Sequence, residues 1–346
     1  MKLLRSAALA AAFITIAAYI PHGTPAAVVS RPSARIVHAS DDTAGTLSVM
    51  TWNVKGLPMP VAFGRPSALS EIGRRLASLR HEGRQPHIVL LQEAFISEAK
   101  SIGAEGGYPY MAIGPQPDDA APSPSLDAGF RENARWRKGE DDGKWVGSGL
   151  VILSDYPIVE TARMAFPQDQ CAGYDCLAAK GVLLARVAVP GTSRPVTVID
   201  THLNSRKASG VSVARANTAY AWQAGTVRRF VAKNVGPEDD VIFGGDFNIG
   251  HDPHRLAAAG RGGGFLTGSK EAIATAAGAK LSAPGDEADF LAVQDRAKDK
   301  EYYRPGNGSR LALRGVEIPF GIAEGGFDLS DHLGFVATYQ LAARQL

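Results

Sequence analysis

The chain has 346 residues, of which 45% are hydrophobic and 21% charged, and its formal net charge is +2. This composition is typical of a soluble globular protein with a sizeable core. The near-neutral charge excludes the strong basic field that usually marks a dedicated nucleic-acid-binding protein.

The first 27 residues are typical of a secretory signal peptide. A short basic segment precedes an apolar run of about 14 residues, whereas a membrane-spanning helix needs about 20. Cleavage near residue 26 or 27 would release a secreted or periplasmic protein. Retention of this segment as an N-terminal anchor is the alternative.

Residues 28–46 are rich in Ser, Ala, Pro and Asp and lack periodicity, so we expect a linker there and one folded domain over 47–346. The only two cysteines are Cys171 and Cys176. Because further cysteines and neighbouring histidines are lacking, a zinc site is disfavoured and a local disulfide is expected.

The periodicity of apolar residues predicts a chain with more strands than helices. An apolar stripe at helical spacing over 67–79 and the alanine-rich segment 211–235 predict two helices. Segments 115–144 and 260–264 are expected to be loops. Strands are expected at 47–54, 87–91, 149–153, 181–189, 196–200, 241–248, 289–293 and 335–341. Such an order predicts an α+β layered sandwich.

Polar side chains stand at the end of the apolar run 241–248. Because side chains alternate along a strand, Asp246 and Asn248 share one face and Phe247 points to the other. A carboxylate and a carboxamide held side by side can orient a water molecule or a phosphate oxygen. An ordinary turn after the strand is the alternative interpretation.

Four further strand boundaries carry polar residues: Asn53, Glu93, His202 and the pair Asp331-His332. Each has a structural interpretation, since Asn53 can cap a turn, Glu93 can cap a helix and His202 can be a core imidazole. Their recurrence after apolar runs favours a shared site. Glu93 offers the hard oxygen that Mg²⁺ prefers, and the two histidines suit a general base and an electrophilic stabiliser.

The residues at these boundaries form five motifs in a fixed order. They are Met-Thr-Trp-Asn at 50–53, Leu-Gln-Glu at 91–93, Asp-Thr-His-Leu at 200–203, Gly-Asp-Phe-Asn at 245–248 and Ser-Asp-His at 330–332. This series resembles the successive motifs of the endonuclease/exonuclease/phosphatase superfamily. The resemblance implies a four-layer αββα sandwich with two packed, mostly antiparallel β-sheets, and makes 47–346 a catalytic domain for metal-dependent phosphate ester hydrolysis.

The resemblance also implies a metal site. Asn53 and Glu93 would hold Mg²⁺, with Mn²⁺ or another divalent cation as the alternative, and Asp331 would lie near the metal. Asp289 is similar to the additional acidic residue of the superfamily, although the residues around it fit poorly.

The remaining motif residues would act on the phosphate. By the same resemblance, Asp246 and Asn248 position water and phosphate, His202 stabilises the charge that develops on the phosphorane, and His332 is the general base.

The substrate is indicated by a different segment, residues 171–183. Asp175 followed five residues later by Lys180-Gly181 is similar to a loop of neutral and bacterial sphingomyelinases, in which the lysine is thought to reach the active site. Lys180 would then meet a phosphate and Asp175 would hold it. The alternative is a solvated lysine at a strand start and an aspartate in a turn.

One feature of those sphingomyelinases is lacking, since no obvious exposed aromatic hairpin is found. The segment 302–327 carries four aromatic residues but also three arginines, and it would contact lipid headgroups or cover the site.

Three functions remain. The first is a secreted Mg²⁺-dependent phosphodiesterase that hydrolyses a phospholipid headgroup bond, as sphingomyelinase C does. The second is a secreted endonuclease with nucleic acid as its partner, for which Arg206, Lys207, Arg228 and Arg229 would line a basic groove. The third is a non-catalytic surface binding protein. No protein partner is inferred.

Overall fold

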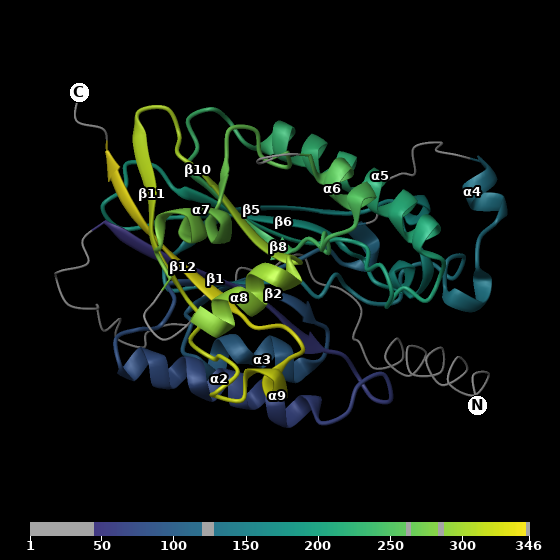
Figure 1. Cartoon of the computed structure of the whole chain (residues 1–346), viewed down its shortest axis with the longest axis horizontal. Helices are drawn as coiled ribbons and strands as arrows, with labels where there is room; N and C mark the ends of the chain where they lie inside the picture. The colour runs from purple at the N-terminus through teal and green to yellow at the C-terminus, as the bar shows by residue number, and fades with distance from the viewer. Residues whose placement is uncertain (1–44, 120–127, 261–263, 283–286, 344–346) are drawn as a thin grey trace.

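Two six-stranded β-sheets pack face to face in the computed structural model, which describes residues 45–119, 128–260, 264–282 and 287–343 (Figure 1). One sheet has the order β11-β12-β1-β2-β4-β3 and the other β5-β6-β7-β8-β10-β9. The expected signal peptide and nearly all of the expected linker lie outside the described residues, so both stay predictions.

The bounds of the strands and helices follow here for reference. The strands are β1 Thr46–Gly56, β2 Ile88–Ala94, β3 Tyr110–Ile113, β4 Val151–Ser154, β5 Ile158–Ala165, β6 Gly181–Val187, β7 Val196–His202, β8 Val241–Asp246, β9 Lys270–Glu271, β10 Asp299–Arg304, β11 Ser309–Glu317 and β12 Phe335–Ala343. The helices are α2 Arg65–His81, α3 Ser97–Glu105, α4 Ala128–Glu132, α5 Val213–Asn234, α6 Pro253–Ala259, α7 Ala272–Ala279, α8 Glu287–Arg296 and α9 Gly326–Leu329.

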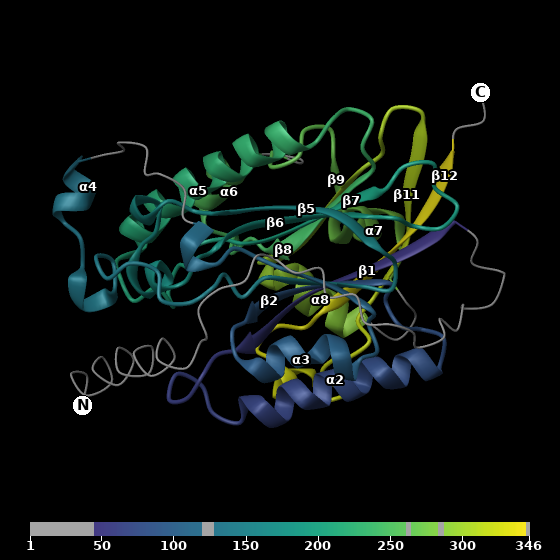
Figure 2. The ribbon, with the colours of Figure 1, turned by 180° about the vertical axis from the view of Figure 1, so that it is seen from behind.

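Helices cover both outer faces, so the molecule has four layers (Figures 1 and 2). Alternation along β1 explains the division, because Val49 belongs to the core between the sheets and its neighbour Met50 to the core beneath α2. The stripe Leu69, Ile72 and Leu76 of α2 is fully buried, and each such side chain contributes roughly 1.5–3 kcal/mol.

The other outer face is covered by α5 and α6. Tyr220, Ala224 and Val227 of α5 pack with Phe243 and Ile199 of the second sheet. The four-layer sandwich implied by the resemblance is therefore confirmed. Within the described residues, no helix has both the length and the apolar character that crossing a bilayer requires.

The centre of each sheet is a pair of parallel strands, and every other strand pairing given for the two sheets is antiparallel. β1 pairs in parallel with β2, and β7 with β8. The register sets Asn53 opposite Gln92 and His202 opposite Asp246. Because parallel strands end at the same edge, each pair delivers its polar terminal residues together.

The two expected helices are confirmed as α2 and α5, but the strand expected at 289–293 is wrong. Those residues lie in α8. A short apolar run fits a strand or a helix equally well, and here Glu287 and Asp289 place negative charge in the first turn, which favours a helix.

The segment 302–327 also differs from its expectation as an insert. Tyr302 and Tyr303 lie in β10 and are buried, as is Phe320, whereas Phe327 is half exposed. The expected loop 115–144 contains α4 and two short 3₁₀ turns, Pro117–Asp119 and Trp136–Lys138, and its residues 120–127 lie outside the described part of the chain.

His87, just before β2, gives the fold a sensitivity to acid. Its Nδ1 accepts a hydrogen bond from the Ser48 backbone N–H (3.0 Å), and its ring stacks on Tyr156 with centroids 5.3 Å apart. Burial, together with the charge of Arg80, lowers the pKa of His87 from 6.5 to about 4. The native imidazole is therefore neutral at neutral pH.

We predict that the free energy of unfolding falls as the pH drops from 6.5 toward 4. His87 becomes protonated in the unfolded chain over this range but stays neutral in the native protein. The expected loss is on the order of 2 kcal/mol, allowing for the partial exposure of the ring. Urea unfolding at about pH 7 and about pH 5 measures it. His87→Asn keeps an acceptor near Nδ1, so it should show a shallower pH slope; equal slopes would contradict the prediction.

Candidate active site

The carboxyl ends of the two parallel strand pairs meet across the sandwich. Asn53 of β1 and Glu93 of β2 come from one sheet, and Asp246 of β8 from the other. The Asn53 amide nitrogen donates to Glu93 Oε1 (3.0 Å) and to Asp246 Oδ2 (3.1 Å). The structure thus brings together three of the residues that the sequence singled out.

Burial controls the electrostatics of the two carboxylates. It raises the pKa of Glu93, while the Asn53 amide and the charge of Lys180 oppose the rise. Burial acts on Asp246 in the same direction, but opposing effects, of which the charge of His332 is the largest, outweigh it and hold the pKa of Asp246 below its usual value. Asp246 therefore carries its negative charge into the centre of the site.

Backbone strain occurs at two of these strand ends. Glu93 has φ +57° and Asn248 has φ +49°, in the left-handed region that residues other than glycine rarely adopt. Asn248 is held there by its own N–H, which donates to Asp246 Oδ1 (2.9 Å), and by its side chain, which donates to Leu203 O (3.1 Å). Strain of this kind, roughly 1–3 kcal/mol per residue, clusters at functional sites.

His332 forms a dyad with an aspartate that the sequence interpretation missed. Its Nδ1 lies 2.7 Å from Asp299 Oδ2, and its Nε2 lies 3.8 Å from Asp246 Oδ2. Burial alone lowers the pKa of His332, but the charge and hydrogen bond of Asp299 outweigh burial and raise it. We infer that in the neutral form of His332 Nδ1 carries the proton bound to Asp299, which leaves the Nε2 lone pair free to accept one.

Asp289 does not join this site. Its Oδ1 accepts a hydrogen bond from the backbone N–H of Ile322 (2.9 Å), so it links α8 to the following loop. Asp299, the first residue of β10, lies opposite Asp246 in the ladder and takes the place beside His332. The sequence signal for Asp299 was weak. β10 is a polar segment, and its acidic residues Asp299 and Glu301 would ordinarily be expected at the surface, although both are buried.

Asp331 lies at the rim rather than among the carboxylates. Its side chain is 53% exposed and its Oδ2 lies 3.7 Å from Lys55 Nζ. The residues beside it are anchored, since Ser330 Oγ donates to Asn53 O (2.6 Å) and Trp52 Nε1 donates to His332 O (2.8 Å). These bonds fix the turn that carries His332.

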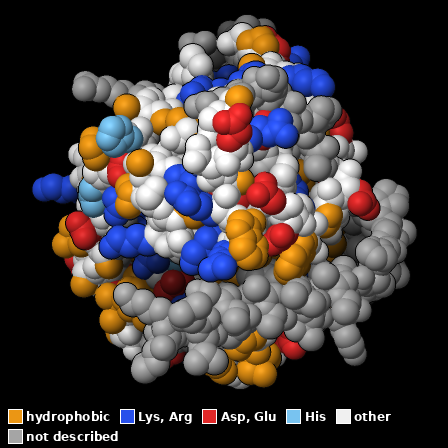
Figure 3. All heavy atoms as spheres, turned by 90° about the vertical axis from the view of Figure 1, so that its right-hand side faces the viewer, with side chains coloured by type: hydrophobic (Ala, Val, Ile, Leu, Met, Phe, Trp, Pro, Cys, Tyr) orange, Lys and Arg blue, Asp and Glu red, His pale blue; other side chains and the backbone are white. Residues whose placement is uncertain are grey.

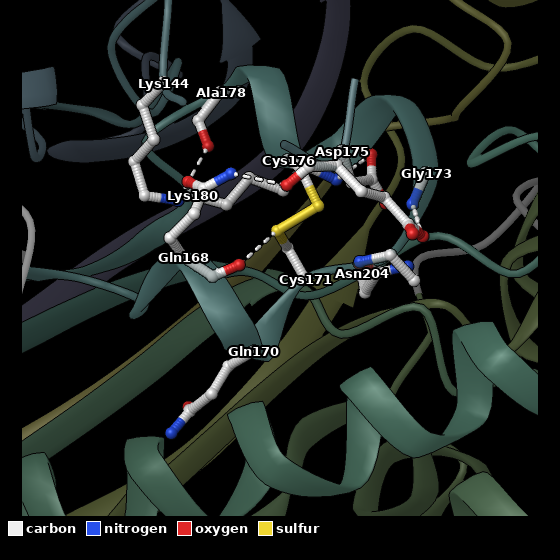
Figure 4. Close-up of a disulfide and its surroundings, with 12 residues drawn as sticks. Lys144, Gln168, Gln170, Cys171, Gly173, Asp175, Cys176, Ala178, Lys180 and Asn204 are labelled. Atoms are coloured by element: carbon white, nitrogen blue, oxygen red, sulfur yellow. Dashed lines mark hydrogen bonds and ion pairs between the residues drawn. A yellow bond between two sulfur atoms is a disulfide. The ribbon is translucent and has the colours of Figure 1, made fainter. Parts of the chain in front are cut away.

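Lys180 reaches the site from the start of β6. It is 5% exposed, and its Nζ lies 2.9 Å from Asp175 Oδ1 and 3.1 Å from His202 Nε2 (Figure 4 shows the contact with Asp175). Burial and the charge of Lys180 lower the pKa of His202 to about 3, so His202 is neutral. Since its Nε2 accepts from the ammonium, its proton lies on Nδ1, which has no partner among the described residues.

The loop that carries Asp175 is closed by a disulfide between Cys171 and Cys176, which confirms the expected local pairing (Figure 4). Two backbone N–H groups of the loop donate hydrogen bonds to side chains outside it. Ala172 N donates to Asn204 Oδ1 (2.9 Å) and Gly173 N to Glu140 Oε1 (2.8 Å). Asp175 is thus presented to Lys180 by a short, cross-linked and docked loop.

Carboxylates that can hold a hard cation, a histidine oriented by an aspartate, and a buried lysine define a site for hydrolysis of phosphate esters. The profile of the Endonuclease/Exonuclease/phosphatase family matches residues 50–332. The chain therefore belongs to this family, and membership identifies it as a metal-dependent hydrolase of phosphate esters. No curated protein matches the chain.

Solved structures show the same fold. A variant of beta toxin from Staphylococcus aureus with bound magnesium ions is 18% identical, with a TM-score of 0.54 over 84% of this chain and 98% of that one. Sphingomyelinase C from Streptomyces griseocarneus is 18% identical, with a TM-score of 0.50 over 85% and 99%. D. rerio TDP2 complexed with a single strand DNA product is 15% identical, with a TM-score of 0.53 over 85% and 99%.

We predict that Asp299→Asn lowers kcat about 100-fold or more, because an amide no longer holds the charge or the ring orientation of His332. Hydrolysis of a chromogenic phosphodiester measures it. Asp289→Asn is the matched control, since it makes the same change outside the site and should leave kcat within about twofold. Equal losses in the two variants would show that Asp299 has no special part in the reaction.

Proposed function

We propose that this protein is a Mg²⁺-dependent phosphodiesterase that cleaves a phospholipid between its phosphate and its lipid alcohol, as sphingomyelinase C does. The observation that carries the proposal is the position of Lys180, held by Asp175 and placed against His202. A buried ammonium at this point offers a donor to an anionic headgroup phosphate. The Asp175 to Lys180 segment is also the one that resembles sphingomyelinases.

The donor chemistry fits a divalent cation. Asp246 is buried and Glu93 is partly buried, and the two carboxylates share a single amide donor, so a hard cation would relieve their repulsion. Asn53 would supply an amide oxygen only after a flip, because its Oδ1 now accepts from Lys55 N (3.0 Å). We assign Glu93 and Asn53 to Mg²⁺, with Mn²⁺ as the alternative, and leave the exposed Asp331 out of this set.

A bound cation supplies Lewis-acid polarisation of a phosphoryl oxygen. The protein groups do the rest: Asp246 and Asn248 orient the water and the phosphate, and His332 Nε2 takes the proton of the attacking water. The new O–P bond forms as the P–O bond to the lipid alcohol breaks, the leaving oxygen takes a proton from solvent water, and His332 returns its proton to solvent. Lys180 stabilises the charge on the phosphoryl oxygens, and His202, whose Nε2 accepts from the ammonium, holds Lys180 in place.

Surface features favour a lipid. The loop after β1 exposes Met59 and Phe63, 67% and 73% accessible, and Trp136 is 63% exposed after α4. Lys and Arg side chains gather on the face of the molecule beside α4 (Figure 3). Exposed apolar side chains among cations suit an enzyme that works at an anionic membrane surface. The disulfide and the predicted signal peptide favour secretion or a periplasmic location.

The endonuclease is the second candidate, because basic side chains also bind nucleic acid. Three of the four cations expected to line its groove have other partners: Arg206 pairs with Asp252 (3.3 Å), Arg228 donates to Ala258 O (2.7 Å) and Arg229 donates to Thr226 Oγ1 (2.7 Å). This engagement favours the lipid. A non-catalytic binding protein is disfavoured by the intact dyad and carboxylates.

The test is hydrolysis of sphingomyelin, phosphatidylcholine and DNA by the purified protein, with and without Mg²⁺. We expect phosphocholine release from lipid vesicles that EDTA abolishes and added Mg²⁺ restores. Cleavage of DNA without lipid hydrolysis would overturn the proposal in favour of the nuclease. If the protein hydrolyses none of these phosphate esters and His332→Ala changes nothing, the result favours the non-catalytic binding protein.

We predict that Lys180→Met lowers kcat/KM on vesicles about 100-fold, because a charged donor to the transition state is lost. Lys233→Met, which removes the same charge from the exposed last turn of α5, is the control and should have little effect. Initial rates at several salt concentrations separate the local contact from general electrostatic attraction. Equal losses in the two variants would remove Lys180 from the site.

A further inference from the structure

Arg255 of α6 is completely buried behind the proposed site. Its Nε donates to Asn217 Oδ1 (2.8 Å), and its guanidinium lies 4.5 Å from the centroid of the Tyr220 ring. Burying an ionised side chain costs several kcal/mol unless its contacts compensate. On a short helix whose other buried residue is the small Ala259, such a residue requires an explanation.

A single nitrogen of this side chain joins two chain segments. Arg255 Nη1 donates to Asn204 O (2.8 Å) and to Asn248 O (2.8 Å). Asn204 follows His202 by two residues and Asn248 follows Asp246 by two residues, and His202 and Asp246 face each other in the parallel ladder. The guanidinium therefore bridges the two loops that leave the strands at the site.

Both bridged residues are held by further bonds toward the site. Asn248 has a left-handed conformation and donates hydrogen bonds to Asp246 and to Leu203. The hydrogen bond from Arg255 to the Asn248 carbonyl restrains this residue further. Asn204 accepts from Ala172 N of the disulfide loop through its side chain. The next residue, Ser205, donates its backbone N–H to Asp175, the partner of Lys180.

We propose that Arg255 is a positioning residue that fixes the Asp246–Asn248 arm of the site relative to the His202–Lys180 arm. It touches no reacting atom and acts through two backbone carbonyls. The inference rests on the proposed function, in which the two arms hold the same phosphate. A lysine could not replace it, because a rigid planar fork donates in three directions at fixed angles and an ammonium is a single flexible point charge.

The first experiment compares Arg255→Met with Arg186→Met. Arg186 of β6 is a half-buried arginine in the sheet that carries His202 and Asp246, at the end away from these residues. There it donates to Thr197 Oγ1 (2.9 Å) and Asn234 O (3.0 Å). It therefore matches the loss of one positive charge and of hydrogen bonds to a side chain and to a backbone carbonyl. We expect kcat on bis(p-nitrophenyl) phosphate to fall about 30-fold in Arg255→Met, with KM and the Mg²⁺ dependence nearly unchanged, and to fall at most about twofold in Arg186→Met.

A second readout does not depend on activity. Hydrogen exchange followed by mass spectrometry should show faster exchange in Arg255→Met over both 203–209 and 246–252, whereas Arg186→Met should change neither segment. If the wild-type protein hydrolyses no phosphodiester, the proposed function fails while this exchange result still decides the bridge. Unchanged exchange in both segments, or equal kinetic losses in the two variants, would overturn the inference.

If Arg255→Met does not fold, Asn217→Ala decides. It leaves the guanidinium in the chain but removes the acceptor of its Nε–H. We expect kcat to fall about threefold to tenfold with faster exchange at 246–252, since a less constrained fork fixes the carbonyls less well. An Asn217→Ala protein with wild-type kcat and wild-type exchange would contradict the positioning role.

Discussion

The Asn53 amide donates to two carboxylates that come from different sheets, and the geometry of the site depends on that contact. The sheets must approach closely for one amide to reach both Glu93 and Asp246. Gly244 permits this approach, because a Cβ at this position would lie 2.6 Å from a methyl carbon of Leu90 in the facing sheet. A side chain at 244 would therefore require the Leu90 side chain to move from its position between the sheets.

The polar groups between the sheets avoid a further accumulation of negative charge. Gln92 donates to Asp200 Oδ1 (2.7 Å), and burial raises the pKa of Asp200 well above its usual value. Tyr339 donates to Glu301 (2.6 Å), whose pKa burial also raises. Burial thus favours the neutral, protonated form of both acids. The carboxylates near the site that stay ionised have a cationic or histidine neighbour. Without such a neighbour, burying a charged carboxylate costs a large free energy.

Sequence patterns predicted the parts of the site that lie at the ends of apolar strands. Asn53, Glu93, His202 and Asp246 follow hydrophobic runs, and parallel pairing brings such ends together, so short-range patterns suffice. Asp299 and Arg255 gave no such signal. Each is a charged residue in a polar segment, where exposure is the ordinary expectation, and only tertiary packing buries it. Asp289 misled because its flanking apolar residues fit a strand and a helix equally well.

Hydrogen bonds connect the part of the site around Lys180 to the part around Asp246 and Asn248. The backbone N–H of Ser205 binds the carboxylate that holds Lys180, the neighbouring Asn204 carbonyl accepts from Arg255, and the same nitrogen of Arg255 binds the carbonyl of Asn248. In the proposed function Asn248 orients the phosphate, so a displacement of the disulfide loop would alter the hydrogen bonds that hold Asn248. Because Asn248 already occupies a strained conformation, a small loss of restraint allows it to relax out of position. In the proposed phosphodiesterase, a substitution that weakens phosphate binding at Lys180 should consequently alter turnover as well as affinity, since hydrogen bonds connect Asp175 to Asn248 through Ser205, Asn204 and Arg255.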